Sequence, residues 1–142
     1  MIDDKIITQL SIFVNNEPGR LATINRIIKD TGVKVRAFNL AESAEFGILR
    51  AIVEDPDHSY EKLKEKGIIV RKTDIIAISV QDAPDSFFQA AEVLGKNGIN
   101  IEYGYYYSGM AGGILFIRVD DTPKAVEILE KAGVRLLDDG EI

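Results

Sequence analysis

A short polar stretch near the N-terminus carries the residue types that can bind a carboxylate. It lies between a β-like and a helix-like segment and runs Asn15-Asn16-Glu17-Pro18-Gly19-Arg20-Leu21. Amides at a helix N-terminus have no partner inside the helix and, with the helix dipole, favour anions. Gly19 lets another molecule approach the backbone there, and Asn15 or Asn16 can cap the amides. An ordinary capped turn, with Pro18 in the first helical turn, explains the same residues.

Residue types that commonly carry catalysis are scarce in this chain. It has no cysteine, and its one histidine, His58, follows the charged segment 55–57. Thiol chemistry and disulfides are therefore excluded, and the usual pairs of nucleophile and base are absent. The aspartates beside His58 can ligate a metal, but helix capping explains Asp55 and the equivalent pair Asp120-Asp121. We expect a solvated His58, no catalytic residue, no metal and no cofactor, and predict that the protein is not an enzyme.

A tyrosine-rich segment, 103–109, can line an aromatic pocket or stack on bases. Strand alternation places Tyr103, Tyr105 and Tyr107 on one face and Tyr106 on the other, and we favour packing within a sheet because aromatic residues are common in strands. The neighbouring Met110-Ala111-Gly112-Gly113 lacks the spacing and the following helix of a nucleotide-binding loop.

Composition limits the classes of partner. The 142 residues are 46% hydrophobic and 28% charged, with a formal net charge of −6. Because nucleic acids and anionic membranes attract an excess of Lys and Arg, neither is expected as a partner. No apolar run approaches the roughly 18 residues of a membrane span. Met1-Ile2-Asp3-Asp4 does not open a signal peptide, so we expect a cytoplasmic protein.

The elements around the polar stretch follow from apolar periodicity. Alternating, β-branched runs predict strands over 6–14, 33–40, 47–54 and 68–70. Apolar residues at helical spacing predict a helix over 21–29 with one buried stripe made by Leu21, Ile24, Ile27 and Ile28. A second helix begins at 55–57, turns Tyr60 and Leu63 inward and ends at Gly67. The order β-α-β-β-α-β is the split βαβ arrangement of ferredoxin-like folds.

The same order then repeats. Aligning Pro84 with Pro18 gives an offset of 84 − 18 = 66 without a gap, and Gly98 and Gly133 fall on Gly32 and Gly67. The second copy predicts strands over 75–81, 99–107, 113–120 and 134–137, and helices over 86–96 and 123–132. We therefore predict an α+β protein of two tandem ferredoxin-like βαββαβ units, residues 1–72 and 73–142, each an antiparallel sheet with helices on one face. Because units of this small size bury little alone, we expect them to pack as a pseudo-dimer and chains to form a homodimer.

This pattern resembles the ACT family of regulatory domains. Its members share a βαββαβ unit of this length and a turn written Asp/Asn, any residue, Pro-Gly, any residue, Leu, which Asn16-Glu17-Pro18-Gly19-Arg20-Leu21 matches fully. The resemblance covers nearly the whole chain as two copies. It implies regulatory binding of small molecules, most often amino acids, between this turn of one domain and the second strand of its neighbour.

Carried over residue by residue, the resemblance implies a ligand-binding site with two sides. The turn contributes Asn15, Asn16, Gly19, Arg20 and Leu21. The opposite strand is Ile99, Asn100 and Ile101, followed by Glu102, if the partner is the second copy; it is residues 33–36 if the partner is another chain. Side-chain amides and helix N–H groups would hold a carboxylate, and strand carbonyls or an acid an ammonium.

The second copy departs from the motif. Its turn is Gln81-Asp82-Ala83-Pro84-Asp85-Ser86-Phe87, with Asp85 at the position of Gly19. Asp82 and Asp85 can cap a helix, but they would repel a ligand carboxylate by about 1 kcal/mol. We expect a structural role for this turn. Helix capping explains the features that the two turns have in common. Only a bound ligand or a close-approaching backbone would then explain why residue 19 is a glycine.

Two functions follow from these observations. The first is a stand-alone regulatory protein that binds an amino acid at an interface between ACT domains and signals its ligand state to a partner. The alternative is a non-catalytic structural or regulatory subunit of an enzyme of amino-acid metabolism. A small-molecule enzyme on a ferredoxin-like scaffold comes third, because a scaffold alone does not decide function.

Overall fold

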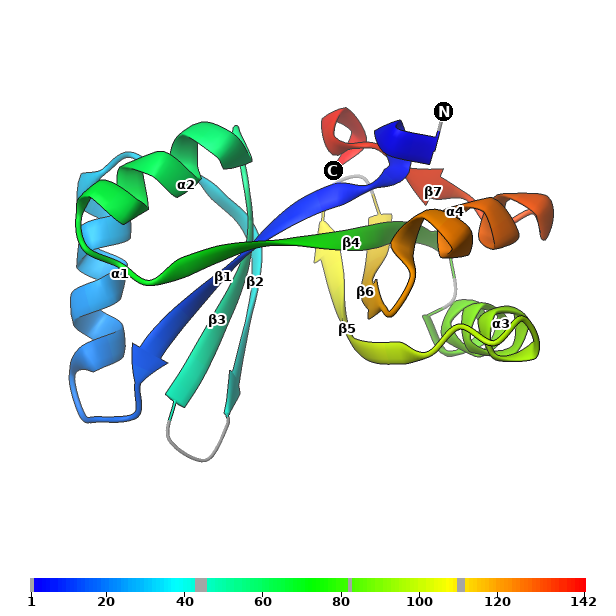
Figure 1. The fold of residues 1–142 in the computed structure, drawn as a ribbon, viewed down its shortest axis with the longest axis horizontal. Helices are drawn as coiled ribbons and strands as arrows, with labels where there is room; N and C mark the ends of the chain where they lie inside the picture. Colours follow the sequence, from blue (N-terminus) through cyan, green and yellow to red (C-terminus); the bar gives the residue numbers. More distant parts are fainter. Residues whose placement is uncertain (1, 43–45, 82, 110–111) are drawn as a thin grey trace. The chain divides into compact units, whose positions relative to one another are not determined.

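The computed structural model describes residues 2–42, 46–81, 83–109 and 112–142. The chain divides into two compact units. The N-terminal unit is Thr8–Thr73, and the C-terminal unit combines Asp74–Ile142 with the first residues of the chain, up to Ile7. Each unit is an antiparallel sheet with helices, so the predicted α+β class is confirmed (Figure 1).

The N-terminal unit has a sheet in the order β2-β3-β1, with the beginning of β4 beside β1. Its elements are β1 (Ile7–Asn15), α1 (Arg20–Asp30), β2 (Val35–Glu42), β3 (Phe46–Val53), α2 (Pro56–Glu65) and the first residues of β4 (Val70–Val80). Leu49 of β3 lies opposite Ile12 of β1 and Leu40 of β2. The Phe13 amide donates to the Ile69 carbonyl over 3.0 Å, which fixes the entry to β4 beside β1.

Both helices of this unit contribute to one hydrophobic core on one face of the sheet. Ile24 and Ile28 of α1 and Leu63 of α2 are buried against the strand residues Leu10, Ile12, Val14, Leu49, Ala51 and Val53. Leu21, Ile27 and Tyr60 complete the core as half-buried neighbours. The predicted stripe on the first helix and the inward side of the second helix are therefore confirmed.

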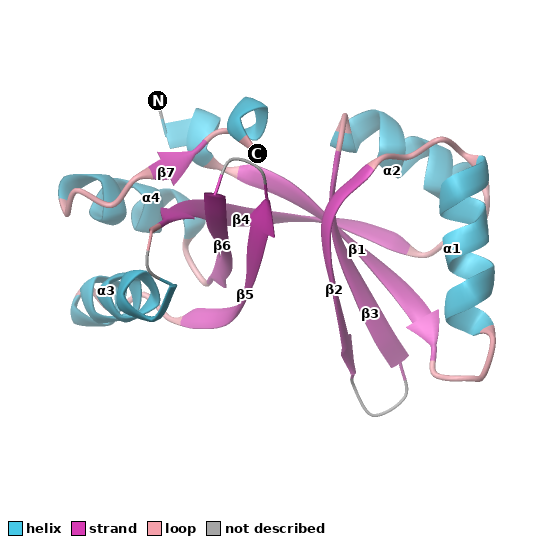
Figure 2. Cartoon of the chain, turned by 180° about the vertical axis from the view of Figure 1, so that it is seen from behind, coloured by secondary structure: helices cyan, strands magenta, loops and turns pink. Residues whose placement is uncertain are grey.

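The C-terminal unit repeats this arrangement in the order β5-β6-β4-β7 (Figure 2). Its elements are the rest of β4, α3 (Ala83–Lys96), β5 (Ile101–Gly109), β6 (Gly112–Val119), α4 (Thr122–Lys131) and β7 (Leu136–Leu137). The 3₁₀ turns Ile2–Lys5 and Asp139–Glu141 belong to the same unit. Ala90 and Leu94 of α3 and Leu129 of α4 pack with Ile78 and Ile117 in its core.

The two units obey the offset predicted from the sequence. The pairs α2 and α4, β3 and β6, and β2 and β5 all begin at the same separation, 122 − 56 = 112 − 46 = 101 − 35 = 66. Gly32 and Gly98, the glycines after the first helix of each copy, have φ angles of 77° and 75°. Their left-handed backbone ends each helix, as predicted. Two tandem ferredoxin-like units are thus confirmed.

Some predicted boundaries are wrong. Residues 68–70 and 75–81 were predicted as separate strands, but β4 runs unbroken through Thr73 and Asp74, because no Gly or Pro interrupts it. The charged C-terminal sequence Asp138-Asp139-Gly140-Glu141 is typical of a solvated tail, but the structure differs from that expectation. It forms a 3₁₀ turn closed by a capping box, in which Glu141 Oε1 accepts from the Asp138 amide over 3.0 Å. The N-terminal 3₁₀ turn has no periodic signal and was not predicted.

Three predictions fall outside the described residues. They are residues 43–45 of the turn expected from Glu42 to Phe46 between the second and third strands, the helix cap at Asp82, and the Met110-Ala111 part of the glycine-rich loop.

Candidate functional site

The turn between β1 and α1 is held by its own backbone. The Glu17 amide donates to the Asn15 carbonyl over 2.8 Å, and the Arg20 amide donates to the Glu17 carbonyl over 3.2 Å. All residues from Asn15 to Arg20 are exposed, and Leu21 is half-buried at the edge of the core. Five of the predicted site residues (Asn15, Asn16, Gly19, Arg20 and Leu21) therefore lie close together in sequence and space, where β1 ends and α1 begins.

Gly19 is the N-cap of α1. Its φ of 85° lies in the left-handed region, and no side chain caps the helix at this residue. The prediction that Asn15 or Asn16 caps the helix is therefore wrong. An asparagine reaches the second and third helical amides only from the N-cap position itself, and α1 begins too late for either residue to hold that position. Pro18 also lies in the turn and not in the first helical turn.

The start of α1 leaves two backbone amides available. The amides of Leu21 and Ala22, at the second and third helical positions, donate to no group in the described parts of the chain. The next residue, Thr23, donates from both its amide and its hydroxyl to the Gly19 carbonyl, each over 3.1 Å. Thr23 thus anchors the N-terminus of α1 to Gly19. The Leu21 and Ala22 amides lie at this same N-terminus, where the helix dipole is positive. Neither Ala22 nor Thr23 stood out in the sequence, because their roles depend on the residue at which α1 begins.

The conformation of Gly19 is itself a reason for glycine. A Cβ atom added there would have no neighbour within 4 Å among the described residues, so none of them approaches closely. The left-handed φ alone disfavours other residues, by roughly 1–2 kcal/mol for one with a Cβ. The inference that only a ligand or a close-approaching backbone explains Gly19 is therefore wrong. The open space over the turn remains compatible with a ligand.

The second copy has no such turn. By the offset of 66, Asp85 is equivalent to Gly19 and Ser86 to Arg20, yet α3 already begins at Ala83. Asp85 therefore lies inside the first helical turn and has a helical backbone in place of a left-handed one. The substitution of aspartate for glycine accompanies a different local fold as well as a different charge.

The predicted strand side of the site lies in the other unit. Ile99 is buried in the C-terminal core, and its amide donates to the Leu94 carbonyl over 2.9 Å. Asn100 is exposed, and its amide donates to Asp120 Oδ1 over 3.1 Å. Ile101 begins β5 and is half-buried. Because the turn and this strand belong to different units, their convergence on one ligand stays a prediction.

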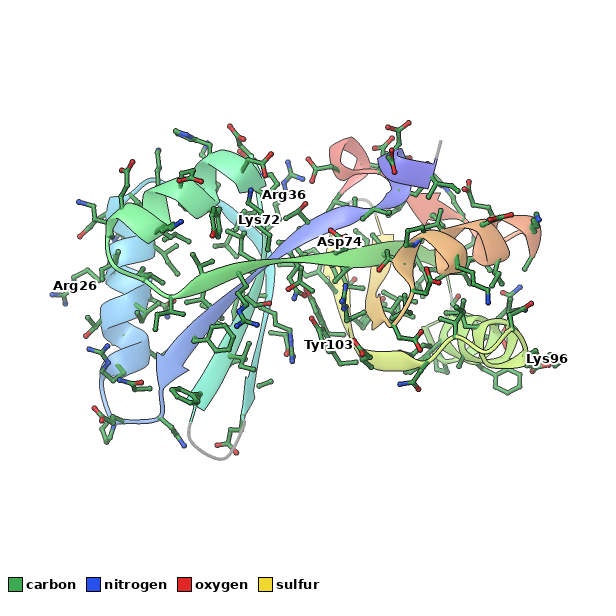
Figure 3. The ribbon with its side chains drawn as sticks, in the orientation of Figure 1. Arg26, Arg36, Lys72, Asp74, Lys96 and Tyr103 are labelled. Atoms are coloured by element: carbon green, nitrogen blue, oxygen red, sulfur yellow. The ribbon has the colours of Figure 1, made fainter. Side chains whose placement is uncertain are left out.

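The alternative strand side lies in the same unit as the turn. Val33 is half-buried against the core, and the Lys34 carbonyl accepts from the Glu54 amide over 3.0 Å. Val35 begins β2 with 40% of its surface exposed. Arg36, labelled in Figure 3, is half-buried. Residues 33–36 can contact a second chain only if β2, which includes Val35 and Arg36, forms part of the interface between the two chains.

A cluster of charged and aromatic side chains joins α2 to β4 in the N-terminal unit. Lys72, labelled in Figure 3, has its Nζ atom 2.9 Å from Asp57 Oδ1 and 4.7 Å from the centre of the Tyr60 ring. The hydrogen bond to Asp57 raises the pKa of Lys72 above its ordinary value. In the C-terminal unit, the Asp138 amide lowers the pKa of Glu141 by hydrogen bonding to its carboxylate. The Lys72 contacts join α2 to β4, and the Asp138–Glu141 hydrogen bond closes the C-terminal 3₁₀ turn, so both are explained without a ligand.

The remaining candidates have structural explanations. His58 is exposed on α2, as predicted. Asp121 caps α4 by accepting from the Lys124 amide over 3.2 Å, but the Asp55 side chain makes no such bond with the described residues and has a φ of 48°. The capping prediction is thus confirmed for Asp121 and wrong for Asp55. Within the described residues, no group of three or more His, Asp and Glu side chains gathers as a metal site.

The tyrosines of β5 alternate as predicted. Tyr103, Tyr105 and Tyr107 lie opposite Arg118, Phe116 and Ile114, while Tyr106 lies opposite Leu115 of the core. The Tyr105 and Phe116 ring centres are 5.2 Å apart. Packing within the sheet therefore accounts for Tyr105.

Comparison with known proteins identifies the family. The family model described as "ACT domain pair" matches residues 5–142. The chain belongs to the ACT domain pair family. No curated protein matches the sequence.

Solved structures agree with an ACT domain pair. Protein BT0572 from Bacteroides thetaiotaomicron is 34% identical, with a TM-score of 0.86 over 96% of this chain and 95% of that one. The ligand-free regulatory subunit of aspartate kinase from Thermus thermophilus is 14% identical, with a TM-score of 0.59 over 93% and 95%. The regulatory subunit of aspartate kinase from Thermus flavus is 15% identical, with a TM-score of 0.57 over 89% and 92%. In the described parts of this ACT pair, no helix is long and apolar enough to span a membrane.

Proposed function

We propose that this ACT domain pair is a non-catalytic regulatory protein that binds a free amino acid at the turn 15–21 and signals its ligand state to a partner protein. The observation that carries the proposal is the open start of α1, where the Leu21 and Ala22 amides have no acceptor among the described residues. These two donors and the positive end of the helix dipole suit one carboxylate. The exposed amide side chains of Asn15 and Asn16 add further donors beside them.

A zwitterion also requires a partner for its ammonium group. The turn offers carbonyl oxygens and the Glu17 carboxylate, and the predicted second strand of a neighbouring domain supplies the rest, either Ile99–Ile101 or residues 33–36 of a second chain. Several groups must converge because both ligand charges lose water on binding. A ligand that bridges two domains stabilises one arrangement of them, and a partner that prefers this arrangement senses the ligand.

A second candidate is a regulatory subunit of a separate enzyme of amino-acid metabolism. The Thermus thermophilus chain described as a regulatory subunit of aspartate kinase has nearly the same extent as this chain. A chain with this fold therefore suits a subunit that associates with a catalytic chain. Affinity purification separates the two candidates: a permanent subunit retains an enzyme with and without amino acids, whereas a sensor's association changes with its ligand.

A thermal-shift screen of the free amino acids tests binding. A ligand that binds only the folded state raises the melting temperature by mass action. Gly19→Asp and Gly19→Asn form a closely matched pair, because both side chains have nearly the same size and can adopt a left-handed backbone, and only Asp adds a negative charge. We expect Gly19→Asp to abolish the shift and Gly19→Asn to retain most of it. No shift with any amino acid at millimolar concentration would refute the proposal.

A further inference from the structure

The helix α3 carries a second apolar stripe on its outer side. Its inner side packs into the C-terminal core through the buried Ala90 and Leu94. The outer side has small or apolar residues at steps of four, three and four positions, which share one helix face, namely Pro84, Phe88, Ala91 and Gly95. Phe88 is 64% exposed and its neighbour Phe87 is 47% exposed. Because one buried stripe is enough to hold a surface helix on its sheet, the core does not explain this outer stripe.

The equivalent helix of the first copy has no such stripe. By the offset of 66, the positions of Phe88, Ala91 and Gly95 are held in α1 by three exposed residues, Ala22, Asn25 and Lys29. None of these three has a large apolar side chain, and two of them are polar. The repeated fold therefore does not require an aromatic residue or a glycine at these positions, and the outer stripe is a property of α3.

The described residues give no reason for a glycine at position 95. Gly95 lies in the last turn of α3 and is not among the residues with a positive φ. A Cβ atom added there would meet no atom of the described residues within 4 Å. Glycine weakens a helix relative to almost every other residue, so a glycine without a local purpose has a cost. Its missing side chain leaves room for another helix to approach the α3 backbone, since the distance between packed helices depends on the side chains at the contact.

The charge around the outer stripe selects the kind of partner. Asp85 and Glu92 lie three residues before and four residues after Phe88, so they flank it on α3. Glu92 also bonds Lys96, labelled in Figure 3, over 2.8 Å, but an exposed pair of this kind is weak and easily replaced. The C-terminal unit has 14 Asp and Glu against 6 Lys and Arg, whereas the N-terminal unit has 9 against 11. A basic partner is therefore attracted to this surface, and a second copy of the same acidic unit is repelled.

We propose that the outer stripe of α3 is the docking surface for a basic amphipathic helix of the partner protein. Phe88 packs against the apolar side of that helix, whose backbone passes close to Gly95 and whose Lys or Arg side chains lie beside Asp85 and Glu92. The stripe extends over about three helical turns, or roughly 16 Å, which suits recognition of a short helical segment. The inference rests on the proposed function for the existence of a partner, whereas docking itself is tested without an amino acid.

Photo-cross-linking identifies what occupies the stripe. The full chain with p-benzoylphenylalanine in place of Phe88 is irradiated in an extract of the cells that produce the protein, and the linked peptides are sequenced by mass spectrometry. The same probe in place of the exposed Asn25 on α1 is the control. We expect the probe at position 88, and not the one at position 25, to link a segment with the pattern of an amphipathic helix and an excess of Lys and Arg. Linking to a second copy, to a segment without this pattern, to the same segment from both positions, or to no protein overturns the proposal.

Calorimetric titration of the linked segment, made as a synthetic peptide, tests the individual contacts. Phe88→Ala should weaken binding about tenfold or more, because it removes the aromatic anchor. Gly95→Leu should weaken it to a similar degree by filling the space beside the helix backbone, while the melting temperature stays unchanged or rises, because leucine favours a helix. Lys29→Leu, at the equivalent position of α1, should leave binding unchanged. Peptide affinity that is insensitive to Phe88→Ala and Gly95→Leu, or equally sensitive to Lys29→Leu, overturns the proposal.

Docking and amino-acid binding can fail separately. Gly19→Asp should abolish the thermal shift by an amino acid and leave the peptide affinity of the amino-acid-free chain unchanged. A chain that docks the peptide as expected but shows no thermal shift with any amino acid would refute only the proposed function.

Discussion

Gly19 and Asp85 hold equivalent positions in the two copies of the fold but have different backbones. Gly19 has a left-handed φ of 85° just before α1, whereas Asp85 lies within the first turn of α3. The N-terminal copy therefore has a looser, solvent-exposed turn, with two helix amides that donate to none of the described residues, and the C-terminal copy has a longer helix. These equivalent positions thus mark a candidate anion site in one copy and a structural helix start in the other.

The left-handed backbone of Gly19 predicts a graded loss of stability. Gly19→Ala should lower the free energy of unfolding by about 1–2 kcal/mol, because a Cβ disfavours this region while meeting no neighbour within 4 Å. Gly19→Asn should cost less, since asparagine visits the left-handed region more readily. Urea denaturation measures both variants. Equal losses for Ala and Asn would contradict a conformational cause.

The glycines of the β5–β6 hairpin should differ in their tolerance of a methyl group. A Cβ at Gly104 would lie 3.0 Å from the Phe116 carbonyl oxygen of the adjacent strand, which cannot move alone. A Cβ at Gly113 would instead meet the ring of Tyr106, which is 51% exposed and can rotate away. We expect Gly104→Ala to cost about 1–3 kcal/mol and Gly113→Ala less than about 1 kcal/mol. Thermal and urea unfolding measure the two losses of stability. A larger loss for Gly113→Ala than for Gly104→Ala would contradict the prediction.

The N-caps of the two equivalent helices α2 and α4 should respond in opposite directions. Asp121→Ala removes the acceptor of the Lys124 amide and should cost about 1 kcal/mol. Asp55→Gly removes no cap bond and relieves a φ of 48°, so it should leave stability unchanged or raise it by up to about 1 kcal/mol. Chemical denaturation of both variants gives the comparison. A loss at Asp55 as large as that at Asp121 would show that Asp55 caps α2 in solution.

The contact between Lys72 and Asp57 should be visible in the titration of the lysine. Asp57 raises the pKa of Lys72 from the ordinary value of 10.5, so Asp57→Asn should lower that pKa, as NMR of the lysine side chain can measure. Because the folded-state pKa is raised, the contact stabilises the fold below the unfolded lysine pKa, and this contribution disappears as pH rises through the folded value. The native chain should therefore lose stability more steeply than Asp57→Asn in that alkaline range. Identical titrations would mean that the contact does not persist in solution.

The sequence predicts the repeat and the cores well, because both depend on periodic patterns. The stripe of Ile24 and Ile28, the stop glycines Gly32 and Gly98, and the constant offset between the two copies are all visible in the order of the amino acids. Continuous β4 was missed because two adjacent strand patterns meet there without a breaking residue, and periodicity alone does not show where one strand ends and another begins.

The details of the candidate site were less predictable, because they depend on single dihedral angles. The motif at Asn16 to Leu21 locates the turn, but it does not show that Gly19 is the N-cap or that the asparagines make no cap. Likewise, Asp55 and Asp121 look alike in sequence, yet only Asp121 accepts a helix amide within the described parts of the chain. Side-chain capping depends on a shift of one or two residues in the helix start, and such boundaries are the least predictable feature of a sequence.

The most direct test of amino-acid binding at the turn is an NMR titration of the ¹⁵N-labelled chain with the amino acid that most raises its melting temperature. We expect saturable shifts of the Leu21 and Ala22 amides, which should move downfield as they donate to a carboxylate, and much smaller shifts at the equivalent Phe87 and Phe88 of α3. The same titration of Gly19→Asp should leave both sets unchanged. Saturable binding that shifts other residues and leaves Leu21 and Ala22 in place would contradict the account.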